Sequence, residues 1–214
     1  MFEDTISLFD DLYQRLDRDN APGFIRDLGC EVRERLQQLD YVIARVRAAG
    51  AAAAAAFARS SQALVDHVEW VKSEGLDYQS VSAPDSTKVT PEEFRAHEAA
   101  SFEMKLLAEA FYYFAGRVRS ILRHKSQPLP GLASFECEGV RNVRNKLLEH
   151  PEGADSQVFI QSWAWSAPRG PVLKAARYGG QESLFPDLGL YANAEEFRTN
   201  LNQILRRALE SRGA

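Results

Sequence analysis

The residues whose types and spacing suggest chemistry lie in one short segment, Arg144-Asn145-Lys146-Leu147-Leu148-Glu149-His150. A guanidinium can clamp an oxyanion with paired hydrogen bonds, and an imidazole that titrates near neutral pH can transfer a proton. His150 is predicted to end a helix, because Pro151 disfavours the α conformation in the residue before it. The helix macrodipole favours a protonated imidazole at that end. This segment is therefore the candidate site.

Other parts of the sequence offer less chemistry. The remaining histidines are predicted to lie within helices near charged neighbours, where solvated or structural roles are expected; they are His67, His97 and His124. The sequence lacks G-x-x-x-x-G-K-[ST], G-x-G-x-x-G, H-E-x-x-H and C-x-x-C, which mark phosphate loops, dinucleotide sites and metal sites. Cys30 and Cys137 fit no metal-ligand or disulfide spacing. We expect no cofactor, no metal and a reducing compartment.

The composition is that of an ordinary globular protein. The chain has 214 residues, of which 45% are hydrophobic and 26% charged, and this length suits one sizeable domain. The net charge of −4 argues against generic coating of nucleic acid, because non-specific affinity needs an excess of Lys and Arg. Residues 117–150 nevertheless hold seven Lys or Arg against three Glu, so a local basic site is compatible with the composition.

The sequence offers no membrane segment. Its N-terminus is acidic, Met1-Phe2-Glu3-Asp4, and lacks the basic and apolar regions of a signal peptide. The alanine run at 51–56 is too short to cross a bilayer and is flanked by Arg47 and Arg59. The sequence therefore predicts a soluble, cytoplasmic protein with no membrane contact.

Hydrophobic spacing predicts helices through the first two thirds of the chain. Apolar residues recur every three or four positions in 5–18 and in 23–74, and the second region is either one helix or two joined at Gly50. Residues 75–89 form a predicted loop. Thr90-Pro91-Glu92-Glu93 predicts a capped helix start, with a buried seam ending near His124; the seam comprises Leu107, Phe111, Phe114, Val118 and Ile121.

The last third mixes helix and strand. Residues 135–150 are predicted to form a shorter helix, and alternation over 156–165 with a partner at 171–174 predicts a β-hairpin. Asn193-Ala194-Glu195-Glu196 predicts the cap of a last helix. The predicted fold is mainly α, a helical bundle with a small hairpin before the last helix. Residues 1–214 form one predicted domain, with N-terminal helices at 1–75, a core containing the candidate site at 90–151, the hairpin at 156–178 and the C-terminal helix at 193–211.

The candidate segment and its helical surroundings resemble the HEPN superfamily. Arg144, the polar Asn145 and a short spacer ending in His150, following the long helical stretch from about Thr90 to Pro151, are similar to the signature of that group. Neither the N-terminal helices nor the hairpin belongs to the resemblance. Members are compact helical domains, often dimeric, and many are metal-independent ribonucleases of toxin–antitoxin, CRISPR and abortive-infection systems.

The resemblance implies that Arg144 and His150 are the catalytic pair and that Asn145 orients them. Cleavage of RNA without metal needs a group that moves a proton from the 2′-hydroxyl or to the leaving oxygen, which an imidazole does. A guanidinium would stabilise the charge on the non-bridging phosphate oxygens. The expected product is a 2′,3′-cyclic phosphate.

Helix geometry constrains this pair. Six helical residues turn through about 600°, so Arg144 and His150 would stand roughly 120° apart around the axis and about 9 Å apart along it. They converge only if the last turn unwinds at Pro151 or if a second subunit supplies the opposite group. A two-fold homodimer would do the latter, so we expect a composite site in a homodimer.

A structural interpretation of the same residues is open too, in which Arg144 pairs with an acid such as Glu149 and His150 caps carbonyls. Five further cations could extend an RNA track or form a solvated helix face; they are Arg117, Arg119, Arg123, Arg141 and Lys146. Trp163 and Trp165 could stack bases but are expected to pack against helices. The alternative function is a non-catalytic RNA- or protein-binding module, with RNA, an antitoxin or another protein as partner, in a defence or stress system.

Overall fold

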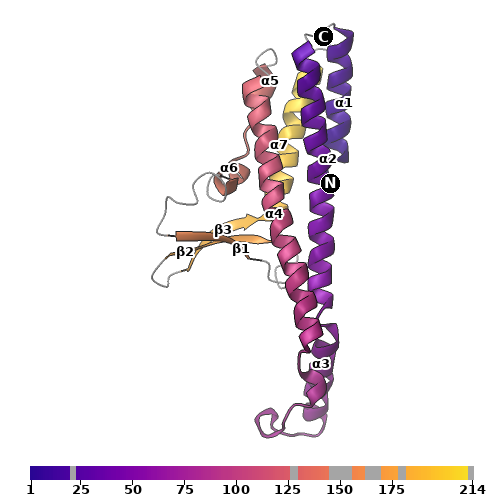
Figure 1. Ribbon diagram of the computed structural model, residues 1–214, viewed down its shortest axis with the longest axis vertical. Coiled ribbons are helices and arrows are strands. Elements are labelled where there is room, and N and C mark those ends of the chain that lie inside the picture. Colours follow the sequence, from indigo (N-terminus) through magenta and orange to yellow (C-terminus); the bar gives the residue numbers. More distant parts are fainter. Residues whose placement is uncertain (20–22, 126–129, 145–155, 162–169, 178–181, 212–214) are drawn as a thin grey trace.

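The computed structural model describes residues 1–19, 23–125, 130–144, 156–161, 170–177 and 182–211. This part of the chain is predominantly helical, as the sequence predicts (Figure 1). Its helices are α1 Glu3–Arg18, α2 Gly23–Ala55, α3 Ala58–Ser73, α4 Pro91–Lys125, α5 Pro130–Ala133, α6 Glu138–Arg144 and α7 Leu190–Glu210. The short 3-10 turns η1 Tyr78–Ser80 and η2 Asp85–Thr87 lie between α3 and α4.

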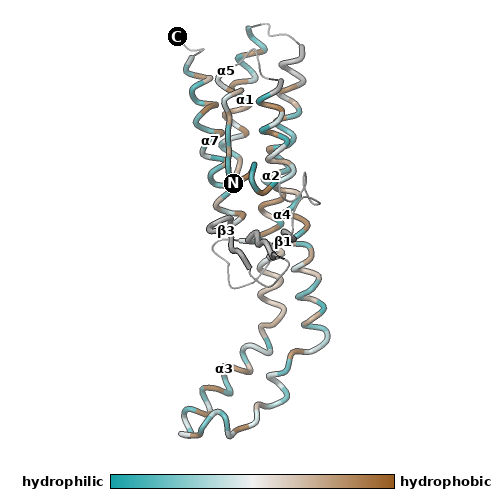
Figure 2. The backbone as a smooth tube through the Cα atoms, turned by 90° about the vertical axis from the view of Figure 1, so that its left-hand side faces the viewer, coloured by the Kyte–Doolittle hydropathy of each residue, from teal (hydrophilic) through white to brown (hydrophobic). Residues whose placement is uncertain are grey.

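Two long helices, α2 and α4, run side by side through the molecule, and α1 and α7 complete a bundle around their upper half (Figure 1). Hydrophobic and hydrophilic residues alternate turn by turn along these helices (Figure 2), so each helix buries one stripe. The predicted seam of α4 is confirmed: Phe111, Val118 and Ile121 are buried, and Leu107 and Phe114 pack against the core. Beyond the bundle, α2 and α4 continue as a pair towards α3.

An aromatic cluster joins the N-terminus to the C-terminal half. The ring of Phe197 in α7 packs edge-on against Phe2 at 6.0 Å and against Phe135 at 5.2 Å between centroids. All three rings are fully buried. Burial of a phenylalanine contributes roughly 1.5–3 kcal/mol, so this cluster holds α7 against the segment that leads into α6.

The first long helical region is two helices, but the break is not at Gly50. Residues 56 and 57 separate α2 from α3, and Gly50 stays inside α2, where a Cβ would lie 3.5 Å from the Sδ of Met104 in α4. Packing against α4 therefore overrides the weak helix propensity of glycine, which costs about 1 kcal/mol relative to alanine.

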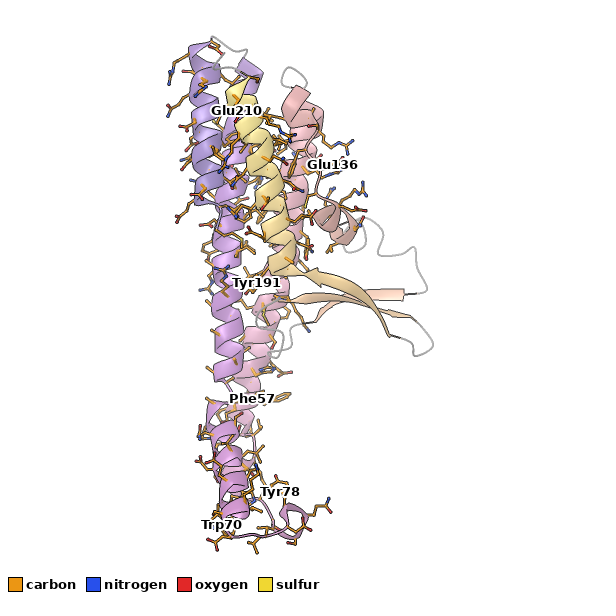
Figure 3. The ribbon with its side chains drawn as sticks, turned by 180° about the vertical axis from the view of Figure 1, so that it is seen from behind. Phe57, Trp70, Tyr78, Glu136, Tyr191 and Glu210 are labelled. Atoms are coloured by element: carbon orange, nitrogen blue, oxygen red, sulfur yellow. The ribbon has the colours of Figure 1, made fainter. Side chains whose placement is uncertain are left out.

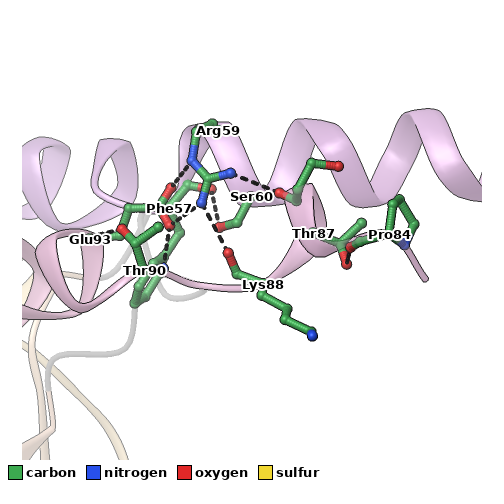
Figure 4. Close-up of polar contacts among 9 residues, drawn as sticks. Phe57, Arg59, Ser60, Pro84, Thr87, Lys88, Thr90 and Glu93 are labelled. Carbon is green, nitrogen blue, oxygen red and sulfur yellow. Dashed lines mark hydrogen bonds and ion pairs between the residues drawn. The ribbon is translucent and has the colours of Figure 1, made fainter. Parts of the chain in front are cut away.

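The predicted start of α4 is confirmed in detail. The Glu93 amide donates to Thr90 Oγ1 at 3.2 Å, and the Thr90 amide donates to Glu93 Oε2 at 2.8 Å. Arg59 of α3 also donates to Glu93 Oε2 at 2.8 Å and to the carbonyl oxygens of Ser86 and Lys88 (Figure 4). The capping box therefore also ties the loop and α3 to the start of α4.

The predicted start of the last helix is wrong. α7 begins at Leu190, not at Asn193, with Gly189 in the extended N-cap conformation. Asn193 is buried in the first turns of α7 and donates to the Tyr112 hydroxyl at 2.8 Å. Burial of Leu190 in the core extends the helix towards its N-terminus, and the amide that resembles a cap in the sequence makes a tertiary hydrogen bond instead.

The stretch predicted as one helix at 135–150 contains the shorter α6, and α5 precedes it. Val140 and Val143 are buried, as expected for the inner side of that helix, and residues 145–150 lie outside the described part.

Three strands follow, β1 Ser156–Gln161, β2 Val172–Arg177 and β3 Glu182–Gly189, in antiparallel order β1-β2-β3. The predicted hairpin at 156–178 stays a prediction because its connection, 162–169, with Trp163 and Trp165, lies outside the described residues; β3 was not predicted.

Within the described ranges, no helix taken singly has the length and apolar character to cross a membrane, although residues 28–55 and α3, bent by 45°, meet both criteria as a pair.

The capping box predicts a specific loss of stability. Replacing Thr90 by Ala removes the acceptor for the Glu93 amide, and loss of such a cap costs about 1 kcal/mol. We expect Thr90→Ala to lower the free energy of unfolding by that amount in urea denaturation. Thr87→Ala is the matched control, because the Thr87 hydroxyl donates only to an exposed carbonyl of Pro84. Equal effects of the two substitutions would contradict the capping role.

Candidate functional site

Arg144, the first residue of the candidate segment, is the last residue of α6. Val140 and Val143 hold this short helix in the core. The stem of Arg144 crosses α4 at Gly116, where an added Cβ would stand 2.1 Å from Arg144 Cδ and 2.8 Å from Nε. No residue larger than glycine fits at position 116 unless the arginine moves. The partly buried side chain of Arg144 therefore packs directly against the backbone of α4 at Gly116, a contact that we call the seat of Arg144.

A second close approach fixes the other side of α6. A Cβ at Gly139 would stand 2.4 Å from the Oδ1 of Asn193 in α7. Thus α6 is wedged between α4 and α7, with a glycine at each contact. Neither contact could be predicted from the sequence, because a glycine that makes room for a neighbouring side chain looks the same there as a glycine in a turn.

The remaining members of the predicted catalytic group, Asn145 and His150, lie outside the described residues, as does Lys146. The pairing of Arg144 with His150 therefore stays a prediction. The described part of the site is its guanidinium end.

The predicted RNA track is a series of arginine–glutamate pairs. Arg117 pairs with Glu31 of α2 at 3.2 Å, and Arg141 lies 3.6 Å from Glu138. Arg119 and Arg123 share the carboxylate of Glu136, with Arg119 at 2.7 Å. These pairs reduce the positive charge presented to phosphate. The side chains of Arg117, Arg123 and Arg141 are still more than 40% exposed, so each can face solvent while paired.

The thiol of Cys137, next to Glu136 in the chain, is unsuited to nucleophilic chemistry. Cys137 is buried immediately before α6, and burial raises its pKa to about 12. A thiol with a raised pKa supplies little thiolate, which is the reactive form. Within the described ranges, no three His, Cys, Asp or Glu side chains are grouped to hold a metal ion.

Two histidines occupy structural positions near α3. His97 stacks on Phe57 with 4.6 Å between ring centroids, and its Nδ1 lies 3.1 Å from the Ala53 carbonyl oxygen. His67 is 7% exposed and stacks on Trp70 at 5.8 Å. These contacts support the structural role expected for His97, whereas the Nε2 of His67 is buried with no hydrogen-bond partner in the described part of the chain. Trp70 and Tyr78 lie at the far end of the molecule from α6 (Figure 3).

A groove of about 720 Å³ runs between α3 and the following connection. This groove could not be predicted from the sequence, because its two walls come from separate segments of the chain. The residues that line it are Ala63, Asp66, His67, Trp70, Val81, Ser82, Pro84 and Ser86.

Comparison with known proteins assigns no family: no family model, no curated protein and no solved structure matches the chain.

Glu136 provides a pH-dependent test of the arginine pairing. Burial opposes its ionisation, but hydrogen bonds and charge from Arg119 and the charges of Arg123 and Arg141 outweigh burial and lower its pKa below 4.5. A lowered pKa in the folded state contributes stability that is present above the unfolded pKa and lost as pH falls through the folded pKa. We expect Glu136→Gln to destabilise the protein at pH 7 by less than about 1 kcal/mol, because the group is half exposed.

Urea denaturation between pH 7 and pH 3 measures this effect. The difference between the parent and Glu136→Gln should shrink as pH falls below 4.5. Glu138→Gln is the control, since Glu138 is 76% exposed and 3.6 Å from its arginine. A difference for Glu136→Gln that stays constant with pH would contradict the charge pairing.

Proposed function

We propose that the protein is a HEPN-like, metal-independent endoribonuclease in which Arg144 and His150 act on one phosphodiester and Asn145 orients them. The observation that supports this proposal best is the seat of Arg144 on Gly116. A guanidinium held by packing needs little reorganisation when charge develops on a phosphate, and preorganised donors of this kind stabilise a transition state. The order Arg144-Asn145-x-x-x-x-His150 supplies the proton-transfer group.

The proposed reaction uses the RNA's own nucleophile. The imidazole of His150 removes the proton of a 2′-hydroxyl, and the oxygen attacks the adjacent phosphorus. The bond from phosphorus to the 5′-oxygen breaks, and the leaving oxygen takes up a proton. Arg144 donates hydrogen bonds to the non-bridging oxygens as their charge increases. The products are a 2′,3′-cyclic phosphate and a 5′-hydroxyl end.

The catalytic pair can form in two ways. In a homodimer, Arg144 of one subunit and the partner's His150 would form a composite site, as the helix geometry suggests. In the other arrangement, both groups belong to one chain. Mixing Arg144→Ala with His150→Ala separates the two: a mixed dimer regains one intact site only if the site is composite. The proposal places this activity in the cytoplasm, in a defence or stress system.

A second function is binding without catalysis, and the glutamate partners of the described arginines favour a protein over RNA as its ligand, because they reduce the positive charge presented to phosphate. A module of this kind would bind RNA or a protein such as an antitoxin through the same face. It predicts a gel shift that disappears in Arg144→Ala, with no cleavage by any variant.

Cleavage of labelled RNA in EDTA tests the ribonuclease proposal. Arg144→Ala and His150→Ala should each lower the rate by about 100-fold or more, as is usual for loss of an oxyanion donor or an acid–base group. Gly116→Ala should also lower it strongly, because the new methyl group displaces Arg144.

Gly131→Ala is the matched control, since a Cβ there meets nothing within 4 Å, and it should cleave like the parent. Equal cleavage by every variant, or by none, would contradict the proposal. Circular dichroism should show that Gly116→Ala retains its helices, which separates displacement of the arginine from unfolding.

A further inference from the structure

The groove between α3 and residues 81–86, which we call the α3 groove, has one wall that is a single face of a helix. The residues of α3 that line it are Ala63, Asp66, His67 and Trp70, and their spacing of three and four positions places them on one side of the helix. The opposite wall is held by Arg59, which donates to the carbonyl oxygens of Ser86 at 2.8 Å and Lys88 at 2.9 Å. Its volume of about 720 Å³ is typical of a ligand site.

His67 gives the α3 groove a buried polar atom that lacks a partner. The side chain lines the groove but is only 7% exposed, and its Nε2 has no hydrogen-bond partner among the described residues. Burial without a partner costs free energy, because the nitrogen loses water and gains nothing in exchange. A ligand that donates a hydrogen bond to this nitrogen would recover that cost.

Two more groups of the same wall favour a cationic ligand. Asp66 is exposed, accepts a hydrogen bond from Gln62 at 2.7 Å and forms no ion pair with another described residue. Trp70, at the end of the molecule (Figure 3), is 48% exposed and stacks on His67 at 5.8 Å between ring centroids. The rest of an exposed indole attracts cations. A cation that packs on Trp70 and donates to both Asp66 and a neutral His67 satisfies all three groups.

Arginine meets these requirements better than lysine. A guanidinium is planar, stacks on aromatic faces and carries five N–H donors, so one group can serve a carboxylate and an imidazole while it packs on an indole. The lysine ammonium is a compact charge that holds its water more strongly. Ala63, Val81 and Pro84 supply apolar lining, which suits the aliphatic stem of an arginine.

Negative charge extends beyond the α3 groove. Residues 60–86 contain five Asp or Glu against one Lys. Three of these carboxylates are exposed, lie outside the groove and form no ion pair with another described residue; they are Glu69, Glu74 and Asp77. A free guanidinium compound would leave them unmatched, whereas a segment with several basic residues would complement them. The distribution of charge therefore favours a basic peptide over a small molecule.

We propose that the α3 groove binds an arginine side chain from a basic segment of a partner protein. The guanidinium packs on Trp70 and donates to the carboxylate of Asp66 and to Nε2 of His67. Neighbouring basic residues of the same segment face the carboxylates outside the groove. The site lies at the far end of the molecule from α6 (Figure 3), so it does not depend on the proposed ribonuclease activity.

Binding of a fluorescein-labelled tetra-arginine peptide to the full chain, measured by fluorescence anisotropy, tests the site. Asp66→Asn and Trp70→Ala should each weaken binding by at least about tenfold in Kd. Asp85→Asn is the matched control and should bind like the parent, because Asp85 belongs to the same acidic segment but lies outside the groove and pairs with Lys88 at 2.6 Å. A tetra-lysine peptide should bind at least about tenfold more weakly than tetra-arginine.

His67→Phe separates recognition from folding. Phenylalanine keeps a ring that can stack on Trp70 but removes the unpartnered nitrogen. The urea midpoint of this variant should therefore stay unchanged or rise, while its affinity for tetra-arginine falls. A histidine with only a structural role would give the opposite pattern, a lower midpoint with unchanged binding, and that pattern would overturn the proposal.

Three further results would each overturn it: tetra-arginine that does not bind, equal losses for Asp66→Asn and Asp85→Asn, or agmatine that binds as tightly as the peptide. Equal losses would mean that only the overall charge matters. Tight binding of agmatine would assign the groove to a free guanidinium compound instead of a partner protein. None of these results bears on cleavage, which the assay in EDTA tests separately.

Discussion

The long contact between α2 and α4 is the constraint on which the rest of the structure depends. It keeps Gly50 helical and provides the surface on which α1 and α7 pack on one side. It also determines where α6 can lie, because the notch at Gly116 is a feature of α4 itself. A bundle with a shorter or broken α4 would have no defined position for Arg144.

Two glycines determine how α6, and with it the candidate site, packs against α4 and α7. Gly116 admits the arginine stem and Gly139 admits the Asn193 side chain, so α6 lies deeper between α4 and α7 than ordinary side chains allow. Close approach of this kind positions a charged group by packing, which is less sensitive to solvent than an exposed ion pair. Arg119 and Arg123 are held by ion pairs to the half-exposed carboxylate of Glu136.

The sequence predicts the elements whose signals are local. The capping box at Thr90 and the seam of α4 follow from spacing along the chain, and both are confirmed. Asn193 has the same local pattern as a cap, yet the core draws Leu190 into the helix and Asn193 to Tyr112. Tertiary packing decides between such alternatives, and a single sequence does not contain it.

The candidate site likewise combines features that are visible in the sequence with features that depend on tertiary packing. The types and order of Arg144, Asn145 and His150 are visible in the sequence, whereas the seat on Gly116 requires knowing which helix α6 packs against. Likewise, the glutamate partners of Arg117 and Arg119 come from distant segments, so a basic stripe in sequence is a paired stripe in the structure.

The chemistry of the RNA ends tests the central claim most directly. After incubation in EDTA, mass spectrometry of the products should find 2′,3′-cyclic phosphate and 5′-hydroxyl ends with the parent protein and none with His150→Ala. Ends that carry a 3′-hydroxyl and a 5′-phosphate would mean that water, not the 2′-hydroxyl, attacks the phosphorus. That result, or intact RNA, would contradict the proposed use of Arg144 and His150.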